Sequence, residues 1–266
     1  TAQKKSAGLR NGVIVNIEDA KNAIKEAIDA VEQNAGTTVE SVVTAVGGEL
    51  IESQNSKGVV PVSSTNKSTK EIGPADIQRV IDSATAIKVS DDKEKLHVIP
   101  QNFIVDGVSG ITDPIDRMGT RLEAEVHIVT VSKSIIQNLR SCISRADYFL
   151  EGVMLKTLAQ THSVCHQDEM ELGSILIDLG AGTTDVLVLF KGAPISTASI
   201  PVGGNLVTND IAIVTGITTQ AAEKIKIESG CCWLPNINPE NDLEVILPGV
   251  GGKSPEITKQ SQICQI

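Results

Sequence analysis

Apolar residues recur at intervals of three and four along several parts of this chain, and this spacing predicts amphipathic helices. The first helix begins after Asn16, whose side chain is suited to cap it, and ends near Asn34, ahead of Gly36. A second helix begins at Pro74 and carries its apolar stripe through Ile87. Further helices are predicted from Ser132 to about Tyr148 and from Gln220 to Ile227.

Other segments show the patterns of strands. In Arg121–Thr130 the alternation predicts one buried face, made of Leu122, Ala124, Val126 and Ile128. Pro100 interrupts the strand predicted at Leu96–Gly107, so we expect a bulge or an edge position there. The apolar runs ILI and VLVLF, at 175–177 and 186–190, predict strands covered on both faces. Further strands and a loop that marks a candidate domain boundary are predicted at Ser41–Gly48, Lys57–Ser64 and Ser63–Gly73.

Composition restricts the classes of function. The chain has 266 residues, of which 41% are hydrophobic and 21% charged, as in ordinary globular proteins. A formal net charge of −10 without a cluster of Lys and Arg argues against a nucleic-acid partner. Aromatic residues make up 2% of the chain and leave few platforms for stacking bases. No apolar run reaches the roughly 18 residues that a membrane-spanning helix needs.

The cysteines and the N-terminus indicate the setting of the protein. Five scattered cysteines, an odd number without an export signal, predict reduced thiols in a cytoplasmic protein. The start TAQKKSAGLR does not resemble a natural one, so we expect the chain to be a fragment.

The turn in ILIDLGAGTTDVLVLF carries the clearest candidate chemistry. Gly180 and Gly182 leave the backbone bare, so successive N–H groups can converge on one anion, such as a phosphate. Thr183 and Thr184 add hydroxyl donors. Asp178 would be repelled by phosphate unless a cation lay between them, and Mg²⁺ bound through water fits that position. The alternative is a tight hairpin that needs glycine for its geometry alone.

Other motifs indicate little chemistry. The turn is neither a Walker A loop nor a Rossmann glycine motif. His162, Cys165 and His166 offer three metal ligands at most and lack the paired spacing of metal sites. We expect the adjacent Cys231 and Cys232 to be buried small hydrophobic residues. Two further histidines lie in strand patterns and are expected to be packed core or edge residues, namely His97 and His127.

DLGAGTTDVLVLFKGA resembles the second phosphate-binding segment of the actin, Hsp70 and sugar-kinase superfamily. More narrowly, the chain resembles the FtsA family of bacterial cell-division proteins along nearly its whole length. The segments that follow the family pattern in order include GLRNGVIVNIEDAKNAIKEAI, NSKGVV, HVIPQNFIVDG, RLEAEVHIVT, GGNLVTNDIA, AAEKIKIESGC and LPGVGGK.

The resemblance implies an α/β fold of actin-like, ribonuclease-H-like subdomains with an inserted small α+β subdomain. The first actin-like subdomain would comprise 1–60 and 126–172, with the FtsA-specific insertion at 61–125. The second actin-like subdomain would follow at 173–216 with the phosphate hairpin, and a nucleotide-capping subdomain would begin at 217–266.

The implied function is that of an ATP-binding protein that polymerises and links the FtsZ ring to the membrane and to downstream division proteins. It would be a scaffold with at most weak ATPase activity. The implied partners are the FtsZ C-terminal tail, further copies of the protein, and downstream division proteins through 61–125. The alternatives are a phosphotransferase or chaperone-like ATPase of the same superfamily, or a pilus-type actin homologue.

The resemblance also implies roles for individual residues. Asp178, Gly180, Gly182, Thr183 and Thr184 match the phosphate segment, with Mg²⁺ near Asp178. Glu223 and Lys226 match the pair that reaches the ribose and adenosine of ATP. Gly203 and Gly204 match a turn near the nucleotide cleft. The alternative for Glu223 and Lys226 is an ordinary surface ion pair. The alternative for Gly203 and Gly204 is close backbone packing.

Several parts of the family pattern are expected to lie outside this chain. They are a first phosphate hairpin, a second adenosine segment, a C-terminal amphipathic helix that binds the membrane, and most of the FtsZ-tail site beyond Ile266. The resemblance therefore implies a cytoplasmic protein that, at full length, is peripheral on the inner face of the membrane at the division site.

Overall fold

The computed structural model describes residues 1–62, 69–252 and 254–266, which divide into two compact units. Unit 1 comprises Thr1–Asp178 and Thr183–Pro201, and unit 2 comprises Leu179–Gly182 and Val202–Ile266. Most of the loop predicted at Ser63–Gly73 lies outside the described residues. Among the described residues, no helix is both long and apolar enough to cross a bilayer.

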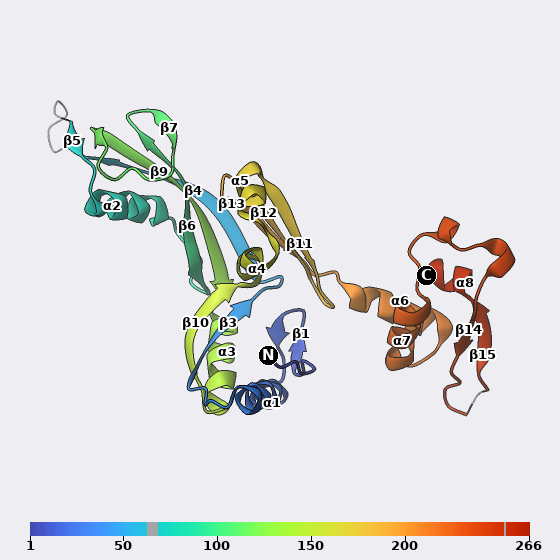
Figure 1. Cartoon of the computed structure of the whole chain (residues 1–266). Coiled ribbons are helices and arrows are strands. Elements are labelled where there is room, and N and C mark those ends of the chain that lie inside the picture. Colours follow the sequence, from blue (N-terminus) through green and yellow to red (C-terminus); the bar gives the residue numbers. More distant parts are fainter. Residues whose placement is uncertain (63–68, 253) are drawn as a thin grey trace. The chain divides into compact units, whose positions relative to one another are not determined.

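Unit 1 mixes helices and strands (Figure 1). Its helices are α1 (Ile17–Ala35), α2 (Pro74–Thr85), α3 (Lys133–Arg145), α4 (Lys156–Val164) and α5 (Gln167–Leu172). Its longer strands are β3 (Ser41–Val46), β4 (Ile51–Pro61), β6 (Lys93–Val105), β7 (Val108–Ile111), β9 (Arg121–Ser132), β10 (Phe149–Leu155), β11 (Ser174–Leu179), β12 (Thr184–Phe190) and β13 (Ala193–Ile200). Two-residue strands are β1 (Leu9–Arg10), β2 (Val13–Ile14), β5 (Lys70–Glu71) and β8 (Met118–Gly119).

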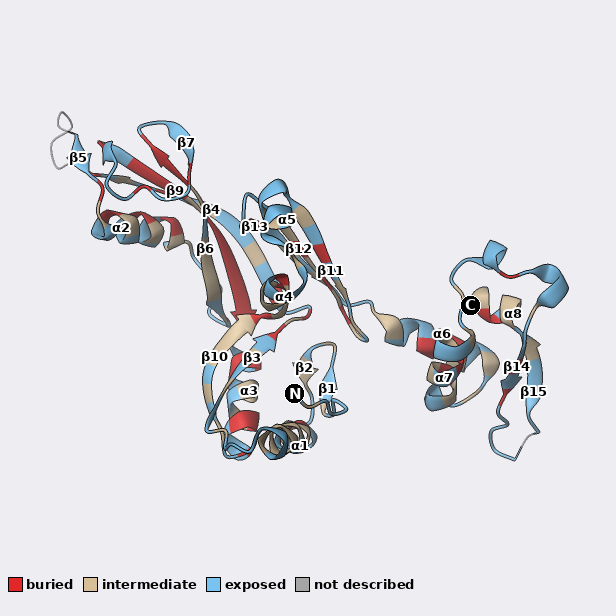
Figure 2. Cartoon of the chain, in the orientation of Figure 1, coloured by how far each residue is buried: buried red, intermediate tan, exposed pale blue. Residues whose placement is uncertain are grey.

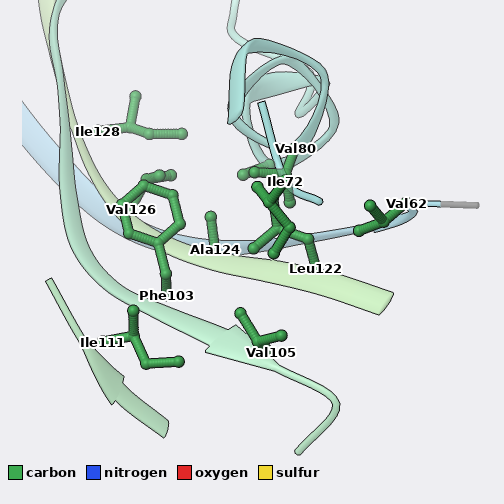
Figure 3. Close-up of a cluster of buried hydrophobic side chains, with 11 residues drawn as sticks. Val62, Ile72, Val80, Phe103, Val105, Ile111, Leu122, Ala124, Val126 and Ile128 are labelled. Carbon is green, nitrogen blue, oxygen red and sulfur yellow. The ribbon is translucent and has the colours of Figure 1, made fainter. Parts of the chain in front are cut away.

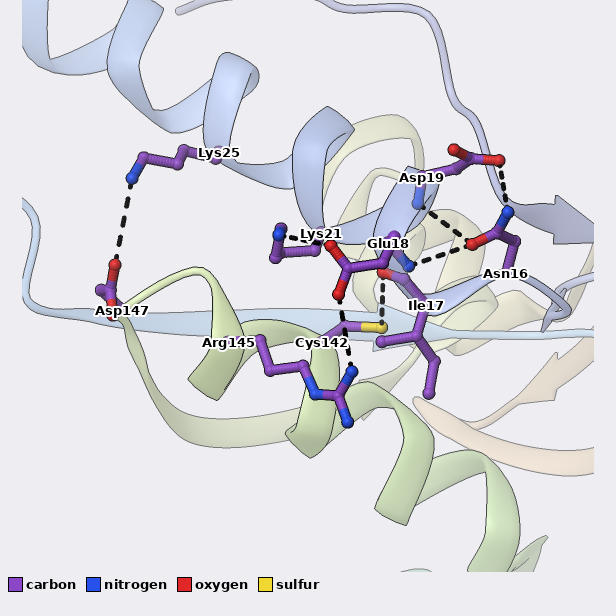
Figure 4. Close-up of polar contacts among 9 residues, drawn as sticks. All are labelled: Asn16, Ile17, Glu18, Asp19, Lys21, Lys25, Cys142, Arg145 and Asp147. Carbon is purple, nitrogen blue, oxygen red and sulfur yellow. Dashed lines mark hydrogen bonds and ion pairs between the residues drawn. The ribbon is translucent and has the colours of Figure 1, made fainter.

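Helix α1 begins and ends where the sequence predicts. The Asn16 side chain accepts hydrogen bonds from the amides of Glu18 and Asp19, at 3.0 and 3.3 Å (Figure 4). Gly36 ends the helix in the left-handed conformation. The helix lies beside α3, where the Cys142 thiol donates to the Ile17 carbonyl at 3.7 Å.

The largest sheet has the antiparallel strand order β4-β9-β6-β7. The predicted inward face of β9 is confirmed, because all four of its residues are fully buried (Figure 2). The alternation does not reveal that the other face is also covered, at His127, Val129 and Val131. The reason is that elements distant in sequence cover this face: His127 contacts Thr197 of β13, and Val129 and Val131 pack with residues of α3 and β10. The bulge expected at Pro100 is confirmed by a register shift between Pro100 and Asn102.

Two hydrophobic cores flank β9. One lies between the sheet and α2, and it includes Val80 and Ala84 of the helix together with Leu122 and Val126 of β9. Figure 3 shows Val80 beside the sheet residues of this core. The other joins Val129 and Val131 to residues of β3, β4, α3 and β10. The predicted domain boundaries stay a prediction. The sheet formed by strands from the predicted insertion at 61–125 also includes β4, which begins at Ile51, before that insertion.

The remaining strands of unit 1 form smaller sheets. Strands β3 and β10 pair in parallel, and β11, β12 and β13 form a three-stranded sheet. One face of that sheet packs Leu176, Leu187 and Leu189 against residues of α4 and α5. The prediction that ILI is covered on both faces is wrong, because Ile175 and Ile177 are 65% and 58% exposed. A continuous apolar run identifies a strand but not whether a second layer covers it.

Unit 2 contains α6 (Gly204–Thr215), α7 (Thr219–Ser229), β14 (Glu244–Leu247), β15 (Glu256–Lys259), α8 (Gln260–Cys264) and the short 3₁₀ helices at Leu234–Asn236 and Pro239–Asn241. Its core joins Ile211, Ile225, Val245 and Ile263. The expectation that Cys231 and Cys232 are buried is wrong, because Cys232 is exposed and Cys231 only partly covered. These thiols lie in the irregular segment after α7.

Gly58 allows α2 to approach the sheet closely. A Cβ atom at this position would lie 2.4 Å from both the Ala84 amide nitrogen and the Val80 carbonyl oxygen. We expect Gly58→Ala to lower the free energy of unfolding by about 1–3 kcal/mol, the usual cost of overpacking. Denaturant unfolding measures this change. Gly152→Ala is the control, since its nearest atoms are 3.8 Å away, and an equal effect of both substitutions would contradict the prediction.

Both strand histidines are packed, as expected. His127 is 1% exposed, with Nδ1 2.7 Å from Asn55 Oδ1 and Nε2 2.9 Å from Thr197 Oγ1. His97 Nε2 accepts a hydrogen bond from the Leu155 amide at 2.9 Å. Burial lowers the pKa of each imidazole below its ordinary value of 6.5.

The lowered histidine pKa values predict how stability depends on pH. Below pH 6.5 the unfolded chain binds protons that the folded chain does not, so the free energy of unfolding should fall as the pH falls. The slope is at most about 1.36 kcal/mol per pH unit for each histidine. Denaturant unfolding between pH 7.5 and 5.5 measures it. The slope should shrink in His97→Gln and His127→Gln but persist in His162→Gln, whose side chain is exposed.

Candidate functional site

The glycine turn joins β11 to β12, as predicted, and within unit 2 it packs against the start of α6. The amides of Gly204 and Asn205 donate to the carbonyls of Gly180 and Ala181, at 3.0 and 2.8 Å. The turn thereby satisfies two of the N–H groups that a helix N-terminus leaves unpaired. In the described part of the chain, the amides of Gly180, Ala181 and Gly182 donate no backbone hydrogen bond. They remain available to an anion.

The glycines before α6 allow this close approach. Gly203 caps α6, and a Cβ atom on it would lie 2.5 Å from the Gly180 carbonyl oxygen and 2.6 Å from that of Ala181. Gly204, the first residue of the helix, has more space, because the nearest atom to its Cβ position is the Lys226 ammonium at 3.3 Å. The structure thus brings Gly203 and Gly204 to Gly180.

The second predicted pair, Glu223 and Lys226, lies on α7 and contacts the first residues of α6. Lys226 Nζ is 2.7 Å from a Glu223 carboxylate oxygen and donates to the Gly204 carbonyl at 3.1 Å and to the Thr208 hydroxyl at 2.8 Å. Thr208 also donates to Glu223. The Lys226 ammonium, followed by the Thr208 hydroxyl, lowers the pKa of Glu223. The pair therefore ties α7 to α6, and half of the Glu223 side chain stays accessible.

Asp178 stands at the end of β11 within unit 1, where the sequence predicts it. One of its oxygens, Oδ2, accepts from Lys156 Nζ and from Gln160 Nε2, both at 2.9 Å. Burial would raise the pKa of Asp178, but the Lys156 and Gln160 hydrogen bonds outweigh it and lower the pKa. The other oxygen, Oδ1, has no partner among the residues that the structure describes.

Asp185 closes the motif as a buried structural acid, 4% exposed. It accepts from Lys156 Nζ at 2.5 Å, from the Ser199 hydroxyl at 2.5 Å and from the Gly48 amide at 3.2 Å. Thr183 is buried and its hydroxyl donates to Asp185 at 3.3 Å, so it is already engaged within the protein. Thr184 begins β12 in a half-buried position.

Comparisons with known proteins point to one family along most of the chain. The model of the SHS2 domain inserted in FtsA matches residues 48–130, and the model of the cell-division protein FtsA matches residues 175–265. The cell-division protein FtsA of Borreliella burgdorferi is 42% identical over 98% of this chain, and that of Pseudomonas aeruginosa 38% over 96%. The chain belongs to the FtsA family. It spans 62% and 60% of the length of these two relatives.

Two solved structures resemble the fold of this chain. A type IV pilus biogenesis complex, PilM–PilN, matches with a TM-score of 0.59 at 15% identity, covering 85% of this chain and 60% of that one. MreB5 of Spiroplasma citri bound to ADP matches with a TM-score of 0.50 at 13% identity, covering 97% of this chain and 55% of that one. The FtsA-family chain has an actin-like α/β fold with an inserted SHS2 domain.

The sequence reasoning missed Lys156 and Gln160. Both belong to α4, 22 and 18 residues before Asp178. The only local signal is that Lys156 is a lone charge between the buried residues Leu155 and Thr157. Burial would lower the pKa of Lys156, but its hydrogen bonds to Asp185 and Asp178 outweigh this and raise it. Among the described residues no group of three or more His, Cys, Asp or Glu could hold a metal, His162 and His166 included.

The packing of the turn on α6 predicts opposite results for two adjacent glycines. Gly203→Ala should destabilise unit 2 by about 1–3 kcal/mol, because the turn carbonyls cannot yield without losing their hydrogen bonds. Gly204→Ala should be nearly neutral, since the flexible Lys226 side chain can move. Denaturant unfolding followed by the fluorescence of Trp233, the only tryptophan of the sequence and part of unit 2, reports both. Similar losses for both variants would refute the assigned contact.

Proposed function

We propose that this chain is the actin-like part of an ATP-binding bacterial cell-division protein. The observation that carries the proposal is the identity of 42% over 98% of the chain to a relative named cell division protein FtsA. The actin-like fold and the glycine turn with free amides support nucleotide binding. The protein would act as a scaffold with at most weak ATP turnover.

In this proposal the residues of the D-x-G-x-G-T-T-D motif bind the phosphates. The free amides of Gly180 and Gly182 would bind phosphate oxygens, with Thr183 and Thr184 shaping the turn. Asp178 would contact Mg²⁺ through water with Oδ1, the oxygen that is not engaged. A single carboxylate is a poor Mg²⁺ site by itself, so the metal would arrive with the phosphates and supply charge neutralisation there.

Glu223 and Lys226 are proposed to bind the ribose and adenosine, with Gly203 and Gly204 keeping the adjacent backbone close. The support is their position on one face of α7, beside the helix that packs on the turn. Their carboxylate and ammonium could accept from and donate to sugar hydroxyls. Binding would require them to exchange part of their mutual ion pair for ligand contacts.

The remaining roles are proposed from the family relationship. The whole protein would polymerise, bind the C-terminal tail of FtsZ, and contact downstream division proteins through residues 61–125. It would act at the cytoplasmic side of the membrane at the division site. A formal net charge of −10 supports a partner other than nucleic acid.

The proposed site predicts which substitutions weaken nucleotide binding. Gly182→Val should crowd the phosphate position, and Lys226→Met should lower the affinity for Mg·ATP by about 1.5–3 kcal/mol, the usual worth of a hydrogen bond to a charged group. Isothermal titration calorimetry measures both.

Lys224→Met is the matched control for Lys226→Met. Lys224 lies on the same helix, but its side chain is 71% exposed and pairs with Glu228. Thermal unfolding of each variant would exclude misfolding as the cause. Mg·ATP affinity that is unchanged in both Gly182→Val and Lys226→Met would reject the assigned site.

A further inference from the structure

Unit 2 contains three of the five cysteines of the sequence. Cys231 and Cys232 follow the end of α7, and Cys264 is the last residue of α8. Cys232 is exposed, whereas Cys231 and Cys264 are each partly covered by the protein. The thiols of Cys231 and Cys264 interact with each other, although the two residues are distant in sequence. The fold of unit 2 therefore brings two reduced thiols together.

The packing of α8 places these two thiols beside each other. The Gln260 side-chain amide, at the start of α8, donates to the Ser229 carbonyl at the end of α7, at 3.0 Å. Cys264 lies four residues after Gln260, on the same face of the helix. Cys231 lies two residues after Ser229. Ile263 anchors α8 in the core of unit 2, which also includes residues of α7.

The two thiols differ in their surroundings. The Cys231 thiol donates to the Trp233 carbonyl at 3.4 Å, so the lone pairs of its sulfur can accept from Cys264. Burial, followed by the neighbouring Cys231, raises the pKa of the Cys264 thiol. Since the thiolate is the nucleophile, Cys264 is less ready than a free cysteine to react first with an oxidant. This difference gives the first step of an oxidation to Cys231 and the second to Cys264.

We propose that Cys231 and Cys264 form a reversible disulfide in the presence of hydrogen peroxide, and that this bond fastens α8 to the end of α7. First the Cys231 sulfur takes one oxygen from peroxide, which gives a sulfenic acid and one water. The Cys264 sulfur then attacks the sulfenic sulfur, and the S–O bond breaks as the S–S bond forms and a second water leaves. Each thiol gives up one electron and one proton, and peroxide takes up both pairs as it becomes two waters. No nucleotide takes part, so the inference does not depend on the proposed function.

Other uses of these thiols fit the structure less well. Among the described residues no group of three or more His, Cys, Asp or Glu could hold a metal, so the three thiols of unit 2 do not form a zinc site. A bond between Cys231 and Cys232 would join Cα atoms about 3.8 Å apart, whereas disulfides usually span about 4.4–6.8 Å. Cys142 and Cys165 belong to unit 1. Cys264 is thus the partner that unit 2 offers to Cys231.

The bond would close a loop that contains both 3₁₀ helices, β14 and β15. Such a closure restricts the unfolded chain more than the folded one, and so it stabilises unit 2. It would also hold the end of α7, the helix that carries Glu223 and Lys226. In a reducing cytoplasm such bonds are usually transient, which suits a response to oxidative stress rather than a permanent link.

The experiment maps the bond in the folded, whole chain. The reduced protein is treated with hydrogen peroxide, the remaining thiols are blocked with N-ethylmaleimide, and the protein is digested with trypsin without a reducing agent. Trypsin separates residues 227–253, which contain Cys231 and Cys232, from residues 260–266, which contain Cys264. Mass spectrometry should find these two peptides joined, with the loss of two hydrogens, and dithiothreitol should separate them.

Single variants identify the bonded sulfur atoms. Cys232→Ser should keep the joined peptides, whereas Cys231→Ser and Cys264→Ser should each lose them. The same treatment of the wild-type chain in guanidinium chloride is the control for folding, because an unfolded chain should spread its pairing over all five cysteines. Joined peptides that persist in Cys231→Ser or disappear in Cys232→Ser would overturn the proposal. Sulfonic acids without joined peptides in the folded wild type would overturn it as well.

A second readout measures the effect of the bond on unit 2. The melting temperature, followed by the fluorescence of Trp233, should rise by at least roughly 8 °C after peroxide treatment, the smallest shift that a typical disulfide gives in a small domain. Dithiothreitol should reverse the rise, and Cys264→Ser should show none. Cys165→Ser, in unit 1, should show the full rise. An unchanged melting temperature in a chain whose peptides are joined would reject the fastening role of the bond.

Discussion

A buried carboxylate group organises the larger unit of this protein. Asp185 is almost inaccessible to solvent, and its donors come from α4, from β13 and from the backbone just before β4. A buried charge that loses its partner costs about 3–5 kcal/mol, so these elements are constrained to meet at one point. Because Lys156 also binds Asp178, the end of β11 is held by the same constraint.

Much of the fold could be predicted from local sequence patterns. Asn16 and Gly36 delimit α1 because capping depends on residues within one turn of the helix end. Pro74 marks the start of α2 for the same reason. Layer coverage could not be predicted, because it depends on elements distant in sequence. The alternation in β9 predicted one buried face, whereas both faces are buried. The apolar run at Ile175 predicted a strand covered on both faces, whereas Ile175 and Ile177 are exposed among the described residues.

The candidate site could also be predicted only in part, because some of its residues follow from local sequence and others from tertiary contacts. Gly180 and Gly182 predict a turn because only glycine leaves the backbone bare. The position of Asp178 beside that turn follows from its place at the end of a predicted strand. Lys156 could not be predicted, since a single lysine among apolar residues carries no information about which distant carboxylate it meets. The Gly203 contact with the turn likewise depends on tertiary packing, because a glycine pair alone does not identify the backbone that approaches it.

Strand β9 belongs to two hydrophobic cores at once, and this limits how the FtsA-family chain can move. Val126 packs in the core beneath α2, and Val129, three residues on, packs in the core shared with β3 and α3. Hydrogen-bond ladders on both edges of β9 would break if the strand bent sharply between them. The continuous β4–β9 ladder, from Ile51 opposite Val131 to Pro61 opposite Arg121, therefore resists a sharp bend along β9. Because β9 contributes side chains to both cores, loss of this strand from the sheet would disrupt both cores together.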